Sequence, residues 1–232
     1  MPNILTIDWD YFFKASRKTR DSFPPIPDGT VGATPDNSLW LKHYKDEYEE
    51  VLIDSCSLAK LIQVFYVGIP QIKFSFFSEN HGEMLNVVRF ICDNLRDDTL
   101  VNITNVDYHH DFSFSGVTPR CDNWGRLIQS DSFEWCSRSD SDRQSFGFPI
   151  MDYFPVREVS FGEVIEKLYS GYYQYIHLCR SDLYSPPKED FLFDNLRTAL
   201  VKNSAGVLNL ETIPDRSDIE AQMTKLYEEN QL

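Results

Sequence analysis

Carboxylates and an imidazole alternate at Asp107, His109 and Asp111, at the end of a strand expected over residues 100–107. Alternate side chains of an extended backbone project to the same side, so these three are expected to point in one direction. Carboxylate oxygens suit Mg²⁺ and Mn²⁺, and an imidazole favours the transition metal. The spacing therefore predicts a metal site, with His110 facing the opposite way as a pocket residue.

Two further segments bring the same residue types to the ends of expected strands. Asp8 and Asp10 close the apolar run that begins at Ile4, and their spacing of two residues predicts that both side chains project to the same side of an extended strand. Two carboxylates so near each other repel unless a cation lies between them. His81 follows a strand expected over 72–77. Taken singly, such an acid pair is often solvated, and a histidine in a turn often only starts a helix. Taken together, the segments predict two Mn²⁺ ions held by six residues: Asp8, Asp10, His81, Asp107, His109 and Asp111.

Short β-branched runs that alternate with amphipathic stretches predict an α/β domain with a mainly parallel sheet. The three segments with predicted metal ligands would then meet at the carboxyl edge of the sheet, where open α/β sheets bind ligands. Strands are expected over 3–8, 72–77, 100–107, 173–179 and 206–210, and helices over 39–53, 57–65, 83–95, 161–169, 189–201 and 218–229. Residues 14–37 and 112–148 are expected to be long ordered loops. No linker or repeat interrupts the chain, so one domain over 1–232 is predicted.

Composition narrows the class of protein further. Acidic residues outnumber basic ones 36 to 22, and a net charge of −14 opposes nucleic-acid binding and favours a cationic substrate. The five cysteines contain no C-x-x-C pair, so reduced thiols are expected. The N-terminus lacks a basic signal-peptide region, and no run approaches the roughly 20 apolar residues of a membrane span. A cytoplasmic protein without membrane contact is predicted.

At this point the motifs resemble a known family. The D-x-H-x-D run at Asp107–Asp111, the turn bearing His81 and the Asp8/Asp10 pair are similar to the binuclear manganese site of the arginase and histone-deacetylase superfamily. The segments 7–13, 105–112 and 121–125 look closer to a small branch that includes peptide arginases. The resemblance implies an arginase-like three-layer α/β fold. It also implies hydrolysis of arginine residues to ornithine, with release of urea, in a ribosomally made precursor peptide.

The chain departs from that family's pattern in ways that leave roles open. Asp8 and Asp10 precede the D-x-H-x-D strand instead of following it, and Asp182 is an alternative ligand at the later position. Trp124 stands where the family's proton-shuttling histidine would fall, so His110 or a chain of waters would have to protonate the leaving amine. Glu211 is similar in setting to the late glutamate that holds the guanidinium. Residues expected to bind substrate are Asp182, Glu211, Asn123 and Trp124.

Other functions remain open at the level of the sequence. Another ureohydrolase or a deacetylase-type amide hydrolase would use the same ligands. A phosphatase of the haloacid dehalogenase type would use Asp8 as nucleophile and Asp10 as acid/base, but it leaves the histidines unexplained. A non-enzymatic metal-dependent or peptide-binding module is the third class. Segments 23–35 and 112–148 are suited to line a groove for an extended peptide, or are ordinary packed loops.

Overall fold

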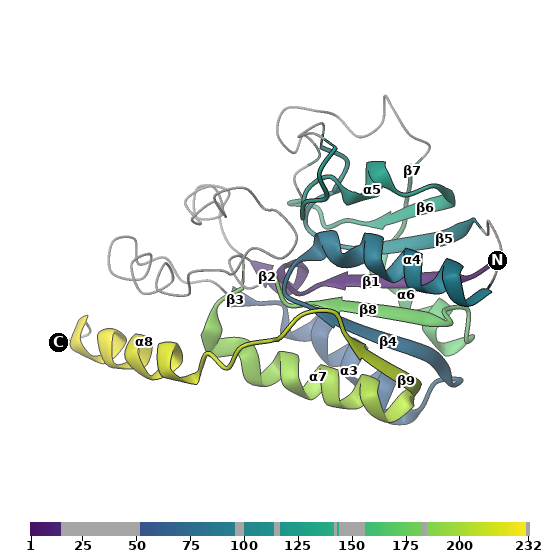
Figure 1. Ribbon diagram of the computed structural model, residues 1–232. Coiled ribbons are helices and arrows are strands. Elements are labelled where there is room, and N and C mark those ends of the chain that lie inside the picture. Colours follow the sequence, from purple (N-terminus) through teal and green to yellow (C-terminus); the bar gives the residue numbers. More distant parts are fainter. Residues whose placement is uncertain are drawn as a thin grey trace.

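A seven-stranded sheet forms the centre of the protein. The computed structural model describes residues 1–14, 52–95, 100–113, 117–141, 143, 156–181 and 185–230. The strand order is β7-β6-β5-β1-β8-β4-β9, and every pairing in this sheet is parallel (Figure 1). Its strands are β1 (Asn3–Asp8), β4 (Ile72–Ser78), β5 (Val101–Val106), β6 (Ser130–Cys136), β7 (Val156–Glu158), β8 (Tyr175–Cys179) and β9 (Ser204–Asn209).

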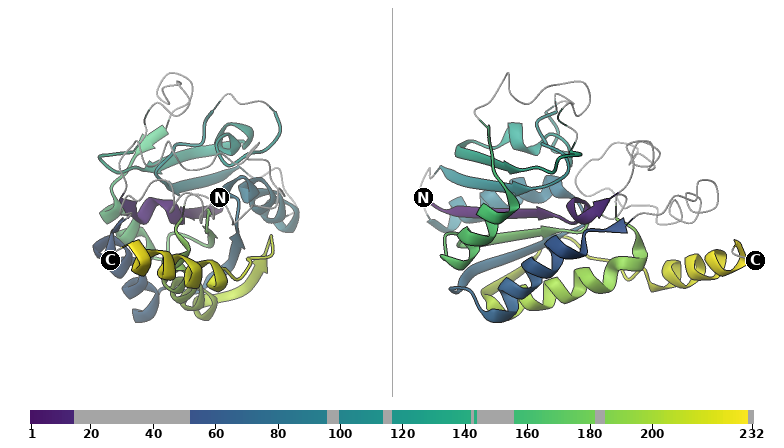
Figure 2. Two further views of the ribbon diagram at one scale, coloured as in Figure 1. Left: turned by 90° about the vertical axis from the view of Figure 1, so that its left-hand side faces the viewer. Right: turned by 180° about the vertical axis from the view of Figure 1, so that it is seen from behind.

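Helices cover both faces of the sheet and give three layers (Figures 1 and 2). One face packs against α4 (Met84–Leu95) and α5 (Trp124–Leu127). The opposite face packs against α3 (Ser55–Val67), α6 (Phe161–Tyr169) and α7 (Asp190–Asn203). Each face has its own apolar core, because side chains alternate between the two faces along every strand. The predicted α/β class with a mainly parallel, three-layer architecture is confirmed.

Shorter elements complete the described part of the chain. A two-stranded antiparallel pair joins β2 (Phe13–Lys14) to β3 (Leu52–Ile53). The 3₁₀ turns are η1 (Trp9–Phe12), η2 (His81–Glu83) and η5 (Pro187–Glu189). Helix α8 (Ser217–Asn230) extends beyond the carboxyl edge of the sheet (Figure 1). None of the helices in these described ranges is long and apolar enough to cross a membrane.

The prediction of one long loop over 112–148 is wrong. This segment contains α5 and β6, and Phe133 and Trp135 of β6 are fully buried. The sequence did not indicate strand β6, because serine and acidic residues fill its alternate positions. Glu134, between the two aromatic residues, instead forms ion pairs with Arg157 and Lys167.

Two other expectations fall partly outside the described residues. Of the helix predicted over 39–53, only 52 and 53 are described, and they form strand β3. The loop predicted over 14–37 lies outside the described residues beyond Lys14.

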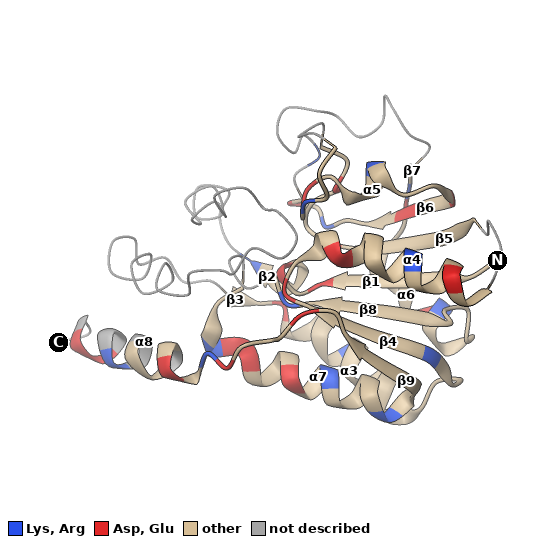
Figure 3. Cartoon of the chain, in the orientation of Figure 1, with Lys and Arg blue, Asp and Glu red and all other residues tan. Residues whose placement is uncertain are grey.

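Strand register sets the site at the middle of the sheet. Asp8 pairs with Cys179 of β8, and Cys179 pairs with Ser78, the last residue of β4. On the other side, Ile7 pairs with Val106, the last residue of β5. The carboxyl ends of β1, β4 and β5 therefore lie together, and acidic segments gather at this edge (Figure 3).

Candidate metal centre

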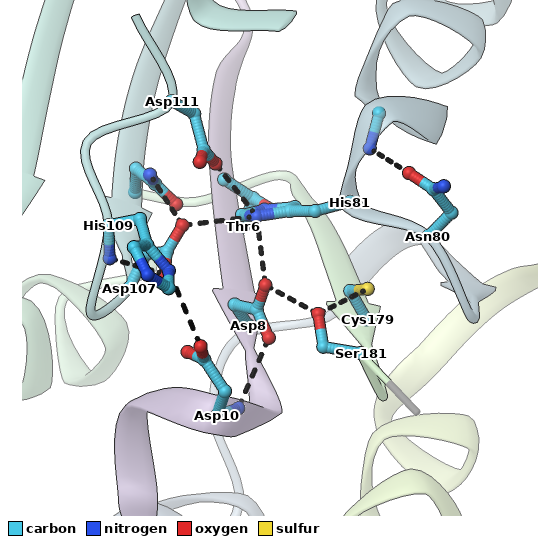
Figure 4. A network of polar contacts seen from close by, with 12 residues as sticks. Thr6, Asp8, Asp10, Asn80, His81, Asp107, His109, Asp111, Cys179 and Ser181 are labelled. Carbon is cyan, nitrogen blue, oxygen red and sulfur yellow. Dashed lines mark hydrogen bonds and ion pairs between the residues drawn. The ribbon is translucent and has the colours of Figure 1, made fainter. Parts of the chain in front are cut away.

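His81 is surrounded by three carboxylates. Its Nδ1 lies 3.0 Å from Asp111 Oδ2, and 3.2 Å from both Asp8 Oδ2 and Asp107 Oδ2 (Figure 4). All four residues are buried, and the His81 side chain is completely so. Single donor atoms from Asp8, His81 and Asp107 lie within 4.8 Å of one another, which is close enough to share one ion. This set is the His81 group.

A second group forms around His109. Its Nδ1 lies 3.5 Å from Asp10 Oδ2 and 4.0 Å from Asp107 Oδ1. Donor atoms of Asp10, Asp107 and His109 also lie within 4.8 Å of one another, and this set is the His109 group. Asp107 belongs to both groups, with Oδ2 directed to His81 and Oδ1 to His109. The two groups are therefore adjacent and share one carboxylate. The two groups contain five of the six predicted ligands, and the sixth, Asp111, joins the same cluster through its contact with His81 Nδ1.

The segment that carries Asp8 and Asp10 is not the extended strand that their spacing predicted. Asp8 ends β1, but Asp10 lies in the 3₁₀ turn η1. Asp8 caps that turn, because its Oδ1 accepts a hydrogen bond of 3.1 Å from the Asp10 amide. Such a cap satisfies an amide that the turn leaves without a backbone partner. The prediction of a shared direction along a straight strand is wrong, although the two carboxylates do meet the same cluster.

The D-x-H-x-D segment also leaves the strand. Strand β5 ends at Val106, and Asp107 Oδ1 accepts a hydrogen bond of 2.9 Å from the His109 amide, which turns the chain. Asp111 then adopts a positive φ of 61°, a conformation that aspartate tolerates better than most residues. A strained backbone at a cluster of ligand-type side chains is typical of a functional site.

Further polar groups hold the carboxylates from outside the cluster. Ser181 Oγ donates to Asp8 Oδ2 at 2.6 Å, and Trp124 Nε1 donates to Asp111 Oδ2 at 2.6 Å. Asn105 Nδ2 donates to Asp107 Oδ2 at 3.3 Å. These donors fix the orientation of each carboxylate, as outer-sphere residues do around metal ions. Neither Ser181 nor Asn105 was predicted. Asn105 lies in β5, two residues before Asp107, which follows the end of that strand.

The carboxylates carry a large electrostatic cost without a cation. Burial, reinforced by Asp10 and Asp107, raises the pKa of Asp8 to about 6. Burial, reinforced by Asp111, raises the pKa of Asp107 to about 7. The pKa of Asp111 is raised by burial as well. Removal from water disfavours the charged form, and neighbouring anions add to that effect.

The two histidines compensate only part of the negative charge of these carboxylates. Burial by itself lowers the pKa of His109, but hydrogen bonding and attraction to Asp10 outweigh it and raise the pKa to about 9. The pKa of His81 is likewise raised well above its usual value, because contacts with Asp107 and Asp111 outweigh burial. Two histidine side chains face four aspartate carboxyl groups. Divalent cations would neutralise all four, so the donor set fits metal ions and can hold them.

Trp124 and Asn123, predicted to bind substrate, are fully buried. The Trp124 ring lies 4.9 Å from the His81 ring, between centroids. Asn123 Nδ2 donates to the Thr118 carbonyl, and its Oδ1 accepts from the Arg120 amide. Both side chains thus support the loop and the ligands around the cluster. Their predicted contact with substrate stays a prediction.

Glu211 and His110 also have structural contacts. Glu211 Oε2 accepts hydrogen bonds from the amides of Glu79 and Asn80, at 2.8 and 2.9 Å, and so anchors the turn that carries His81. His110 is fully buried; its Nδ1 accepts from the Phe112 amide. The His110 ring also lies against Trp135, and its predicted role as a pocket residue stays a prediction. Asp182 lies outside the described residues.

The structure thus defines a three-layer α/β protein with a buried aspartate–histidine cluster that can hold metal ions. Comparison of the chain with protein-family models, with curated proteins and with solved structures finds no match. The resemblance to peptide arginases therefore stays a prediction from the motifs.

Proposed function

We propose that this protein is a manganese-dependent hydrolase that converts arginine residues of a peptide to ornithine and releases urea. One observation carries the proposal: Asp107 is shared by two adjacent Asp/His groups, each able to hold one ion. A pair of ions bridged by a carboxylate is the usual construction of a binuclear hydrolytic site. The mixed carboxylate and imidazole donors favour Mn²⁺ over Mg²⁺.

The Asp8, His81, Asp107 and Asp111 side chains would hold one ion, and Asp10, His109 and Asp107 the other. Bound divalent ions supply a water activated near neutral pH and stabilise negative charge as it develops. In the reaction, water adds to the guanidinium carbon and the bond from that carbon to the side-chain nitrogen breaks. Urea leaves, and the ornithine nitrogen gains a proton.

Substrate approaches from the side of His109. Its side chain is 28% exposed, whereas the other five ligand candidates are at most 7% exposed. Water that enters with the substrate on this side supplies the proton to the departing amine. A solvent proton is preferred over one from His110, because the His110 ring is buried beside Trp135.

The acidic character of the chain supports a basic peptide as substrate. A net charge of −14 attracts arginine-bearing peptides at long range, and salt weakens that attraction. Free arginine carries two backbone charges that need their own partners, whereas a peptide presents neutral amides. The sequence suggested that aromatic side chains of segment 112–148 stack against the peptide. Trp124, Phe133 and Trp135 give no support to such stacking, because all three are in the core.

The test combines metal analysis with product detection. Metal-free protein is loaded with Mn²⁺ and incubated with an arginine-containing peptide, and urea and peptide mass are followed. We expect two bound ions per chain, and one cyanamide unit lost per converted arginine. The Asp107→Asn variant is the matched control and should release no urea.

Two comparisons identify the alternatives. Free arginine turned over with equal or higher kcat/KM would show that the substrate class is wrong while the chemistry is right. Hydrolysis of an acetyl-lysine peptide or of a phosphate ester, with no urea from any arginine substrate, would overturn the proposed reaction in favour of a deacetylase or a phosphatase.

A further inference from the structure

A row of polar side chains crosses the sheet behind His81. Thr6 of β1 pairs directly with His177 of β8, and Ser78 ends the next strand, β4. All three side chains are fully buried, on the same face of the sheet as the apolar core that contains Ile4 and Phe76. Burying hydroxyls and an imidazole in such a core is costly unless every group finds a partner.

Hydrogen bonds connect this row to the metal centre. Ser78 Oγ donates to the Asn80 carbonyl at 2.9 Å and lies 2.8 Å from His177 Nε2. Thr6 Oγ1 lies 3.0 Å from His177 Nδ1 and 2.7 Å from His81 Nε2. The chain therefore runs from Asn80 through Ser78, His177 and Thr6 to the ring nitrogen of His81 that is opposite the carboxylates. Of these residues, Figure 4 shows Thr6 beside the His81 ring.

The direction of each bond follows from the first. A hydroxyl has one hydrogen, and Ser78 gives it to Asn80, so Ser78 must accept from His177 Nε2. Both nitrogens of His177 face hydroxyls, which a neutral imidazole satisfies by donating once and accepting once. Thr6 therefore donates to His177 Nδ1 and, having no second hydrogen, accepts from His81. The hydrogen of a neutral His81 must then lie on Nε2.

We propose that Thr6 and His177 are positioning residues that fix the tautomer and orientation of His81, so that its Nδ1 lone pair is presented to a metal ion. The partner of one ring nitrogen decides which nitrogen of a histidine binds metal. Nδ1 is the nitrogen that faces Asp8, Asp107 and Asp111. The inference rests on the metal centre of the proposed function but is independent of the substrate.

Two substitutions at Thr6 test the role of its hydroxyl. Thr6→Val keeps the shape of the side chain and removes the hydroxyl, whereas Thr6→Ser keeps the hydroxyl. Removal of an outer-sphere partner typically weakens metal binding 10–100-fold. We expect titration with Mn²⁺ to show a loss of about that size for Thr6→Val, and affinity close to that of the unaltered protein for Thr6→Ser.

Thr104→Val is the matched control for burial. Thr104 is a buried threonine on the neighbouring strand β5, but it pairs in register with Leu5 and bonds to Glu134, on the opposite face. Its loss should leave Mn²⁺ affinity unchanged. Equal affinity of Thr6→Val and the unaltered protein would overturn the inference, and so would equal losses in Thr6→Val and Thr104→Val.

A second measurement needs no substitution. Long-range ¹H–¹⁵N correlation spectra of the protein loaded with diamagnetic Zn²⁺ should show His81 protonated at Nε2 and metal-bound at Nδ1. The opposite assignment would overturn the inference. An unaltered protein that binds no Mn²⁺ at all would overturn the proposed function together with this inference. Binding without urea release would overturn the reaction alone and leave the positioning role standing.

Discussion

Asp107 has the central position at the scale of single residues. It is the one carboxylate that belongs to both the His81 group and the His109 group, and its two oxygens face opposite imidazoles. Asp10, in contrast, belongs only to the His109 group. Metal stoichiometry should therefore depend on which of these two acids is lost.

We predict that Asp107→Asn abolishes binding of both Mn²⁺ ions, whereas Asp10→Asn loses one and retains the other. The reason is that Asn cannot supply the charge that a bridging position requires. Metal content per chain after dialysis and atomic emission analysis checks this. Two retained ions in Asp107→Asn would contradict the shared role.

The Asp107→Asn variant also has an expected effect on the stability of the metal-free protein. Because the pKa of Asp107 is raised to about 7, its charged form disfavours the metal-free fold above that pH. Metal-free Asp107→Asn at pH 8 should therefore unfold at a temperature no lower than that of the unaltered protein. A clear drop would indicate that the carboxylate is mainly structural.

At the scale of elements, the short helix α5 supports the loop that ends in Asp111. The Gly125 amide donates to the Asp111 carbonyl at 3.0 Å. A Cβ at Gly125 would lie 2.8 Å from Phe112 Cε2 and 3.0 Å from that same carbonyl oxygen. Contacts so short require the loop itself to move, because one of the atoms is backbone.

Gly125→Ala should therefore destabilise the protein by about 1–3 kcal/mol, as overpacked substitutions do, and weaken Mn²⁺ binding by displacing Asp111. Gly162→Ala is the control, because its Cβ in helix α6 would come no nearer than 3.7 Å to its surroundings. That control should be as stable or slightly more stable. Thermal unfolding and Mn²⁺ titration of both variants measure this, and unchanged Mn²⁺ affinity in Gly125→Ala would contradict the support by α5.

At the scale of the whole molecule, the cluster links stability to pH and metal. The pKa of His109 is raised from 6.5 to about 9, so its proton stabilises the metal-free fold below 6.5, and this contribution is lost as the pH rises through 9. Asp107, with its pKa raised to about 7, acts in the same direction. Burial lowers the pKa of His177, which has the opposite effect but only at more acidic pH.

We predict that the melting temperature of the metal-free protein falls between pH 7 and pH 9. Saturating Mn²⁺ should raise the melting temperature most at pH 9, because the metal replaces the bound protons. Proton release on Mn²⁺ binding, measured at pH 7 in weakly buffered solution, should exceed one proton per chain. A metal-free melting temperature that rises over this range would contradict the assignment.

The sequence by itself determined the layers of the fold and the set of metal-ligand candidates. Short, mostly apolar runs such as 3–8 and 72–77 are typical of strands in a parallel sheet that is covered on both faces, so their pattern was sufficient to indicate it. Strand β6 was not predicted because Glu134 stands between its two buried aromatic residues, and the ion pairs that stabilise this glutamate depend on Arg157 of β7 and Lys167 of α6.

Tertiary structure alone decided how the ligands meet. Spacing suggested extended segments, but the chain turns at Asp8 and Asp107, where side chains cap backbone amides, and Asp111 takes a positive φ. The partners Ser181, Thr6 and His177 also could not be read from the sequence. They reach the cluster only through strand order and register, which bring together residues up to 173 positions apart. Hydrogen bonds act over about 3 Å, so such partners are set by the fold and not by distance along the chain.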